Sequence, residues 1–266
     1  MGHTSGSNGT NHLGVNLAYT KFLFISPQCD DEATKGKLRA AAATISRAYF
    51  NDFEADGARD AAPQDSVQFL SSTCAAGATC SRARYVMQIS SRYRPRLQET
   101  EAELRRRISD VAAINAINGA MRVPQYTSAE MHAYAYRDAR TRPPGRLQHQ
   151  VIIIPMSKTP GWWDMSALER HAYFYPHTDA HTGRQVKGHA VAADAGISTI
   201  YRRLYYNPDG HGRPGEFDFI TYFECDEQHL PVFDEICRSL RDVDQNPEWK
   251  FVVEGPEWRG KRVLKW

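Results

Sequence analysis

The stretch that decides the fold spans residues 151–170 and has the sequence VIIIPMSKTPGWWDMSALER. Its first part, Val151 to Met156, is continuously apolar, which predicts a short strand that is buried on both faces. The segment Trp163-Asp164-Met165-Ser166 then leads into a predicted helix that continues to about Tyr173. A buried strand followed directly by a helix indicates the start of an α+β unit.

The residues that follow complete this unit. Two predicted strands, ISTIYRRLYY at 197–206 and FDFITYFE at 217–224, are joined by the turn-rich sequence NPDGHGRPGE. A helix is predicted over 226–240, because Leu230, Phe233, Ile236 and Leu240 form one apolar stripe. Residues 249–253 are predicted to close the unit as a strand, so the second half has the order β-α-β-β-α-β.

The first half of the chain shows the same order of elements. The patterns predict a strand over 17–25, a helix over 30–50, two hairpin strands over 67–73 and 82–89, a helix over 95–118 and a strand over 130–137. The second helix rests on Leu104, Ile108 and Val111, with Asn118-Gly119 as its end.

Two such halves predict an α+β fold in which two ferredoxin-like units face each other through their sheets, a dimeric α+β barrel within one chain. The expected organisation is a disordered arm at 1–16, an N-terminal half at 17–145 and a C-terminal half at 146–266.

Composition narrows the class of protein. The chain has 266 residues, 41% of them hydrophobic, and a net charge of +2, which is ordinary for a globular protein and does not favour nucleic-acid binding. No apolar run approaches the roughly 20 residues that a membrane-spanning helix needs. The first eighteen residues lack the pattern of a signal peptide.

The five cysteines show no CxxC pair. Cys74 and Cys80 could bridge a small loop, but without a secretory signal we expect free buried thiols and a cytoplasmic location.

Four of the ten histidines fall close together, at His171, His177, His181 and His189. They could belong to a solvated loop in which histidine is incidental. A zinc site is a second possibility, although no cysteine or glutamate completes a zinc pattern. The third is that one of these histidines ligates haem iron.

Two adjacent arginines, Arg202 and Arg203, lie in the middle of an apolar-aromatic strand. A strand alternates its faces, so Arg202 shares a face with Leu204, and Arg203 shares one with Tyr201. One of the two arginines must therefore point inward. An arginine among Leu204, Thr221 and the phenylalanines of the next strand would place a cation in an apolar pocket, where it suits an oxyanion or a ligand on iron.

Together, these motifs resemble the chlorite dismutase family. The run at 151–170 resembles the family's strand, Trp-Trp-Asn/Asp-Met-Ser helix start and Leu-Glu-Arg. RRLYY and FDFITYFECDE resemble its basic-Leu-Tyr strand and the strand after it, in the form that chlorite-degrading members carry. The resemblance covers roughly residues 150–255 and implies a haem b oxidoreductase that converts chlorite to chloride and dioxygen.

The resemblance also implies site residues. The family's arginine above the iron falls on Arg202, with Leu204, Thr221 and Phe223 lining the pocket beside it. Trp162 and Trp163 would lie against the haem near its propionates. A tyrosine of the first half would reach a propionate, for which Tyr136 is preferred over Tyr134.

The iron ligand is the point where this chain departs from the family's spacing, because about twelve extra residues precede Arg202. Counting back from Arg202 gives His189, and counting forward from Trp163 gives His177. We prefer His189, since a loop before the ligand can lengthen at little cost; residues 174–188 would then be an insert, and His181 ranks below both. In the family, a carboxylate near the end of the last helix accepts the hydrogen bond from Nδ1–H of the iron ligand. The resemblance places this position at Gln245, with Asp244 and Glu248 close by.

Three functions follow as alternatives. The first is chlorite degradation, in which Arg202 holds the anionic intermediate. The second is a related haem enzyme with another substrate, peroxidase-like or biosynthetic. The third is a haem carrier or sensor without turnover. The expected partners are a small anionic or oxidant substrate and further copies of the chain, with a pentamer implied by the resemblance, and neither nucleic acid nor membrane.

Overall fold

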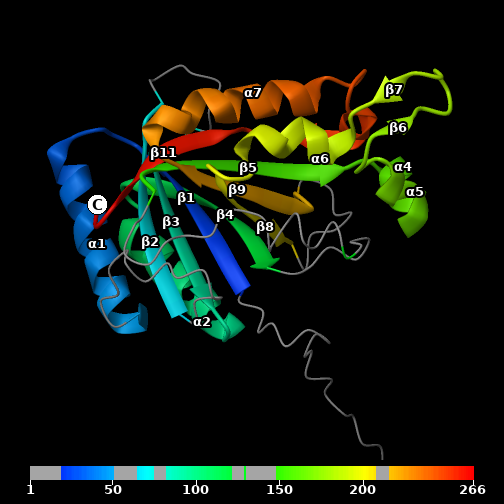
Figure 1. Cartoon of the computed structure of the whole chain (residues 1–266). Helices are drawn as coiled ribbons and strands as arrows, with labels where there is room; N and C mark the ends of the chain where they lie inside the picture. The colour runs from blue at the N-terminus through cyan, green and yellow to red at the C-terminus, as the bar shows by residue number, and fades with distance from the viewer. Residues whose placement is uncertain (1–18, 51–64, 75–81, 122–128, 130–147, 208–215) are drawn as a thin grey trace, which may run out of the picture.

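A computed structural model describes residues 19–50, 65–74, 82–121, 129, 148–207 and 216–266 (Figure 1). The first half contains β1 (Tyr19–Pro27), α1 (Glu32–Phe50), β2 (Asp65–Ser72), β3 (Tyr85–Ser91), α2 (Arg94–Ile108) and β4 (Ala112–Met121). The first five elements follow the predicted order β-α-β-β-α, whereas the sixth, strand β4, overlaps the range predicted as helix. The predicted arm at 1–16 and the predicted strand at 130–137 lie outside the described residues.

The predicted helix over 95–118 is wrong in its second part. Helix α2 ends at Ile108, and residues Ala112–Met121 form strand β4, which pairs antiparallel with β1 along nearly its whole length. Ala112 and Ile114 pack under the helices, whereas Ile117 packs on the opposite face of the sheet. This alternation is that of a strand, and pairing with β1 outweighs the helical propensity of the alanines.

The second half contains more elements than the sequence indicates. They are β5 (Gln150–Lys158), α4 (Pro160–Asp164), α5 (Ala167–Ala172), β6 (His177–Thr178), β7 (Gln185–Val186), α6 (Gly188–Ala193), η3 (Asp194–Gly196), β8 (Tyr201–Tyr206), β9 (Phe219–Cys225), η4 (Glu227–His229), α7 (Leu230–Arg241), η5 (Pro247–Phe251), β10 (Val252–Glu254) and β11 (Trp258–Val263). β5, β9 and α7 agree with the predicted strands and helix.

Other predicted boundaries are corrected. The helix expected from Trp163 to Tyr173 begins at Pro160 and breaks into two, because Met165 is extended and Ser166 starts α5 with a capping box to Glu169. Residues before Tyr201 form helical turns, so β8 is shorter than predicted. In the closing strand predicted over 249–253, Trp249 lies in a 3₁₀ turn, and the extended segment is Val252–Glu254. Strand β11 has no counterpart among the predicted elements.

Nine strands form one antiparallel sheet in the order β10-β5-β11-β2-β3-β1-β4-β8-β9, in which β5 also pairs with β9, and β6 and β7 form a separate two-stranded sheet. The pairing of β5 with β9 joins one end of the order to the strand next to the other end, so the sheet closes into a barrel and β10 is an additional strand beside β5. β11 connects the halves, since it pairs with β5 on one side and with β2 on the other. The expected dimeric α+β barrel within one chain is therefore present.

Three apolar layers fill the molecule. One lies between the first-half strands and helices α1 and α2, and another lies inside the barrel around Tyr222 and Trp258. The third lies between the second-half strands and helices α6 and α7. Figure 1 shows α6 and α7 above β5 and β9, and α1 and α2 on the other side of the barrel. In each half of the barrel, helices cover the outer face of the sheet.

Cys74 is disulfide-bonded, which overturns the expectation that all cysteines are free. Its partner lies outside the described residues. Cys225 and Cys237 are free and buried, as predicted, whereas Cys29 is free but exposed. Disulfides persist mainly in oxidising compartments, so the cytoplasmic location loses the support that free thiols would have given. Within the described residues, every helix is too short or too polar to cross a membrane.

Candidate functional site

A deep pocket opens between helices α6 and α7 and the outer face of strands β5, β8 and β9. The space in it that no protein atom fills is ≈ 1650 Å³, counting the part that is open to solvent. Apolar side chains such as Ile154, Phe219 and Leu240 form most of its wall. An apolar cleft of this kind, with a few polar groups converging in it, is typical of a binding site for a cofactor or small molecule.

Helix α6 brings His189 to the pocket wall. The helix begins at Gly188, whose φ of +69° suits glycine, and Gly188 N donates to Gln245 O at 3.2 Å. His189 N donates to Tyr173 O at 3.1 Å, and the Phe174 ring stacks on the imidazole at a centroid distance of 5.9 Å. Backbone bonds and stacking therefore fix where the imidazole lies.

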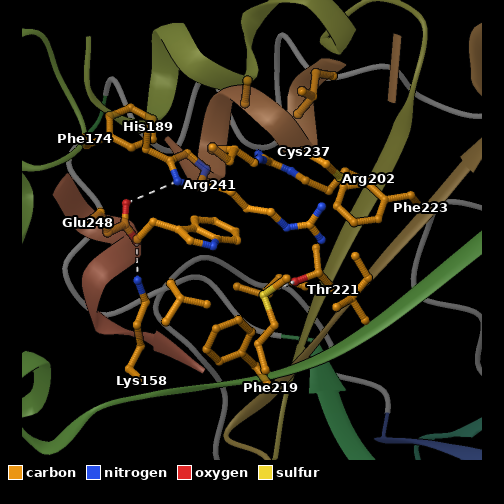
Figure 2. A pocket seen from close by; sticks show the side chains of 18 of the residues that line it. Lys158, Phe174, His189, Arg202, Phe219, Thr221, Phe223, Cys237, Arg241 and Glu248 are labelled. Atoms are coloured by element: carbon orange, nitrogen blue, oxygen red, sulfur yellow. Dashed lines mark hydrogen bonds and ion pairs between the residues drawn. The ribbon is translucent and has the colours of Figure 1, made fainter. Parts of the chain in front are cut away.

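A buried carboxylate, that of Glu248, lies beside the Nδ1 atom of the imidazole. His189 Nδ1 lies 3.2 Å from Glu248 Oε2, and Lys158 Nζ donates to Glu248 Oε1 (Figure 2). Burial alone would raise the pKa of Glu248, but the charge of Lys158 and the contacts from His189 and Lys158 hold that pKa well below its usual range. The carboxylate is thus ionised, and Nε2 is the imidazole nitrogen that this contact leaves available to another partner.

Glu248 corrects the expectation that Gln245 occupies the carboxylate position. The Gln245 backbone carbonyl accepts hydrogen bonds from Lys187 N at 2.9 Å and from Gly188 N, so this residue supports α6 through its main chain. Glu248 lies within the 3₁₀ turn Pro247–Phe251 and is 7% exposed. The carboxylate is therefore present, three residues later than the spacing indicated.

Lys158 is the buried cation of this group. It ends the apolar strand β5, on the face that also presents Ile154 and Met156, and its residue is 9% exposed. Burial lowers the pKa of its ammonium group, and the charge of Glu248 and the hydrogen bond to it offset part of this effect. The ammonium nitrogen also lies 4.0 Å from the centroid of the Trp162 ring. Sequence reasoning missed Lys158, although strand alternation would have placed it in the pocket.

The opposite wall carries the predicted residues of β8 and β9. Arg202, Leu204, Thr221 and Phe223 line the pocket, while Tyr201 packs inside the barrel. The Thr221 hydroxyl donates to Met156 Sδ at 3.7 Å. Figure 2 shows Arg202, Thr221 and Phe223 grouped together across from His189 and Glu248. The predicted alternation of β8 is thus observed.

Arg203 also reaches the pocket wall, which strand alternation did not predict. Its guanidinium lies 4.9 Å from the centroid of the Tyr201 ring.

The two tryptophans occupy different positions in the wall. Trp162 is 1% exposed and contacts the Tyr173 and Phe251 rings, at centroid distances of 5.8 Å each. Trp163 is half-buried, and its indole nitrogen donates to Asp218 Oδ2 at 3.3 Å. Both line the pocket. Tyr136 and Tyr134 lie outside the described residues, so their predicted role is untested.

The other clustered histidines do not line the pocket. His177 and His181 belong to the β6–β7 hairpin region, where His177 Nδ1 bonds to Tyr175 O at 2.8 Å and His181 is exposed. His171 contacts the Tyr175 ring. In the described ranges no three His, Cys, Asp or Glu side chains gather as a metal cluster would require. Of the four clustered histidines, His189 is the one that lines the pocket.

These residues fit a haem group. Haem needs an apolar slot, one imidazole nitrogen for iron and a partner that orients that imidazole. The pocket offers the slot between helix and sheet, His189 offers Nε2, and Glu248 holds Nδ1.

Comparison with known proteins identifies the fold. The sequence matches no protein-family model. The structure is similar to a doubly substituted chlorite dismutase from Candidatus Nitrospira defluvii, with a TM-score of 0.65 and 17% identity over 92% of this chain and 91% of that one. The complex of the same enzyme with imidazole gives 0.64 and 17% over 92% and 91%.

A provisionally assigned chlorite dismutase gives a TM-score of 0.61 and 14% identity over 93% of this chain and 95% of that one. Solved variants of the Nitrospira enzyme replace one arginine and two adjacent tryptophans. At these identities, the similarity shows that this chain has the chlorite dismutase fold.

Proposed function

We propose that this chain is a haem b oxidoreductase of the chlorite dismutase family that converts chlorite to chloride and dioxygen. One observation carries the proposal: a single apolar pocket holds His189, backed by Glu248, on its helical side and Arg202 on its strand side. Haem, when bound, would supply the oxygen-atom chemistry, and the protein would supply position and charge.

Each residue would have a distinct task. His189 would bind iron through Nε2, and Glu248 would keep the imidazole oriented and strengthen it as a donor. Arg202 would hold an oxyanion by charge-assisted hydrogen bonds in a site from which Leu204 and Phe223 exclude water. The residue types that were replaced in the Nitrospira enzyme, an arginine and a tryptophan pair, are those that Arg202 and Trp162-Trp163 supply here.

The β6–β7 hairpin favours a second candidate, a haem enzyme of the same family that acts on another oxidant or substrate. The hairpin lies within residues 174–188, which lead directly into α6 and His189. An insert at this point would change access to the pocket without changing the iron ligand. A haem carrier or sensor without turnover is the third candidate.

Two measurements test the proposal. We expect the haem-loaded protein to show a Soret band that is lost in His189→Ala and kept in the matched variant His177→Ala. The reverse result would mean that the ligand is His177. We also expect dioxygen release when chlorite is added, followed with an oxygen electrode. A haem-loaded protein that releases no dioxygen would point to the second or third candidate.

A further inference from the structure

An unbroken set of aromatic contacts runs from the pocket to the molecular surface. Trp162 lines the pocket, and its ring lies 5.8 Å from the Tyr173 ring and from the Phe251 ring. Tyr173 and Phe251 are 5.6 Å apart, and Tyr173 lies 6.1 Å from His177 on the β6–β7 hairpin. These aromatic rings form a path along which an oxidising equivalent could leave the pocket, provided that Trp162 can give up an electron.

The first ring of this path carries a buried cation. Lys158 Nζ lies 4.0 Å from the Trp162 ring centroid, and its side chain is 5% exposed. The contact is attractive because the face of an indole is electron-rich. Farther out, Lys250 Nζ lies 5.8 Å from the Tyr173 ring and 5.2 Å from the Phe251 ring, but Lys250 is exposed and water screens its charge.

We propose that Lys158 protects Trp162 from one-electron oxidation during turnover, and so keeps oxidising equivalents in the pocket. In the step that is opposed, the oxidant that chlorite would generate in the haem-loaded pocket would gain one electron and Trp162 would lose one, leaving an indole cation radical. Its positive charge would form 4.0 Å from the ammonium group, so that the attraction becomes repulsion in a site where burial weakens screening.

Without this protection, a second electron transfer, from Tyr173 to Trp162, would follow. Tyr173 would return an electron to the Trp162 radical and lose its phenolic proton to water, which would leave a tyrosyl radical close to the surface. Each such event would take an oxidising equivalent from the substrate and would damage the protein. The proposal rests on the proposed function, since it needs chlorite to react at bound haem.

Trp249 provides an internal reference. It also lines the pocket and is half-buried, and its indole nitrogen donates to Glu254 Oε1 at 3.0 Å. Among the residues that the structure describes, no cation is found over the Trp249 ring. A general increase in oxidant in the pocket should therefore raise the oxidation of Trp249 and of Trp162 by a similar factor relative to wild type, whereas loss of the Lys158 charge should raise that of Trp162 alone.

The experiment compares haem-loaded wild type, Lys158→Met and Lys158→Arg after the same number of chlorite equivalents. The proteins are digested, and mass spectrometry gives the ratio of oxidised Trp162 to oxidised Trp249. We expect Lys158→Met to raise this ratio roughly tenfold, given the strength of a desolvated cation–π contact, and Lys158→Arg to stay near the wild-type value. Lys158→Gln, which keeps a donor for Glu248, replaces Lys158→Met if that variant does not bind haem.

An unchanged ratio in the neutral variants, or an equal rise at Trp162 and Trp249, would overturn the protective role. A higher ratio in Lys158→Arg equal to that in Lys158→Met would overturn it as well, because the charge would then be irrelevant. The absorption spectrum is recorded first. A wild-type chain that binds no haem, or that releases no dioxygen from chlorite, contradicts the proposed function itself. A haem-loaded chain that releases dioxygen but shows an unchanged ratio contradicts only the role of Lys158.

Discussion

Arg202 shows how one strand position can set the chemistry of a pocket. It lies on β8 next to Arg203, and the side chains of its face point to the helices rather than into the barrel. Thr221 and Phe223 on the neighbouring strand face the same way. A cation with apolar neighbours interacts strongly with an anion because little water competes for it.

Removal of this cation should affect turnover more than cofactor binding. We expect Arg202→Ala to keep the Soret band of the haem-loaded protein and to lower the rate of dioxygen release from chlorite by roughly 100-fold, the usual effect of losing a preorganised donor. Arg238→Ala is the matched control, since Arg238 is an exposed arginine on α7 that pairs with Glu235. Equal rates in wild type and Arg202→Ala would show that another group holds the anion.

At the scale of elements, the junction before α6 determines whether His189 can reach the pocket. Gly188 has a positive φ, and a Cβ there would lie 2.5 Å from Tyr175 O. The Lys187 and Gly188 amides both bond to Gln245 O. A short helix of six residues has little stability of its own, so these contacts fix its position.

Gly188→Ala should therefore destabilise the fold by about 3 kcal/mol, through backbone strain and the collision with Tyr175 O, and should weaken haem binding. Gly183→Ala is the control, because Gly183 has a similar φ of +67° with no atom within 4 Å of the added Cβ. That variant should lose only ~1 kcal/mol, and its haem affinity should not change. Urea unfolding and haem titration measure the two effects. Similar losses in both variants would mean that packing against residue 175 is unimportant.

Strand β4 illustrates the limit of local patterns at this scale. The helical spacing of Leu104 and Ile108 correctly predicts α2, but the predicted helix also includes residues that form strand β4. Alanine favours a helix over a strand, so the local pattern indicates the wrong element here. Antiparallel pairing with β1 decides between them, and that pairing joins residues from Tyr19 to Ala120.

The whole molecule depends on contacts inside the barrel that join its two halves. Arg262 of β11 forms a buried ion pair with Glu224 of β9 and donates to Gln68 Oε1 of β2 through Nε at 3.1 Å and Nη2 at 2.9 Å. The Arg262 side chain is 3% exposed and that of Glu224 is fully buried. One guanidinium therefore connects strands from both halves.

We expect Arg262→Met to lower the free energy of unfolding by about 3–5 kcal/mol, because it leaves the Glu224 carboxylate buried without its cation. The double variant Arg262→Met with Glu224→Leu should recover a large part of this loss, since an apolar pair needs no compensation. Denaturant unfolding of the two single variants and the double variant measures the coupling. A single variant that loses less than ~1 kcal/mol would place the connection between the halves elsewhere.

The assembly of whole molecules is a separate proposal. We propose a homo-oligomer, with a pentamer favoured by the resemblance to the chlorite dismutases. Light scattering coupled to gel filtration should then give a mass five times that of one chain. A monomer would contradict this proposal and would leave the pocket of the single chain unaffected.

The sequence by itself determined the barrel made from two halves, the strands β5 and β9 with helix α7, and the strand faces that bring Arg202, Thr221 and Phe223 together. These features depend on local periodicity and on motifs that lie within about 20 residues of each other, so they can be seen before folding. His189 was also preferred on spacing alone, and the fold presents it to the pocket.

Only the tertiary structure decided the remaining features, because each depends on residues that are distant in the chain. Glu248 and Lys158 are ninety residues apart and meet only when η5 packs beside the end of β5. Strand β11 is extended because β2 and β5 are both available to pair with it, although its own sequence, WRGKRV, has a glycine and three charged residues. A site held by a buried carboxylate and ammonium needs the whole fold to exclude water, and no local pattern encodes that exclusion.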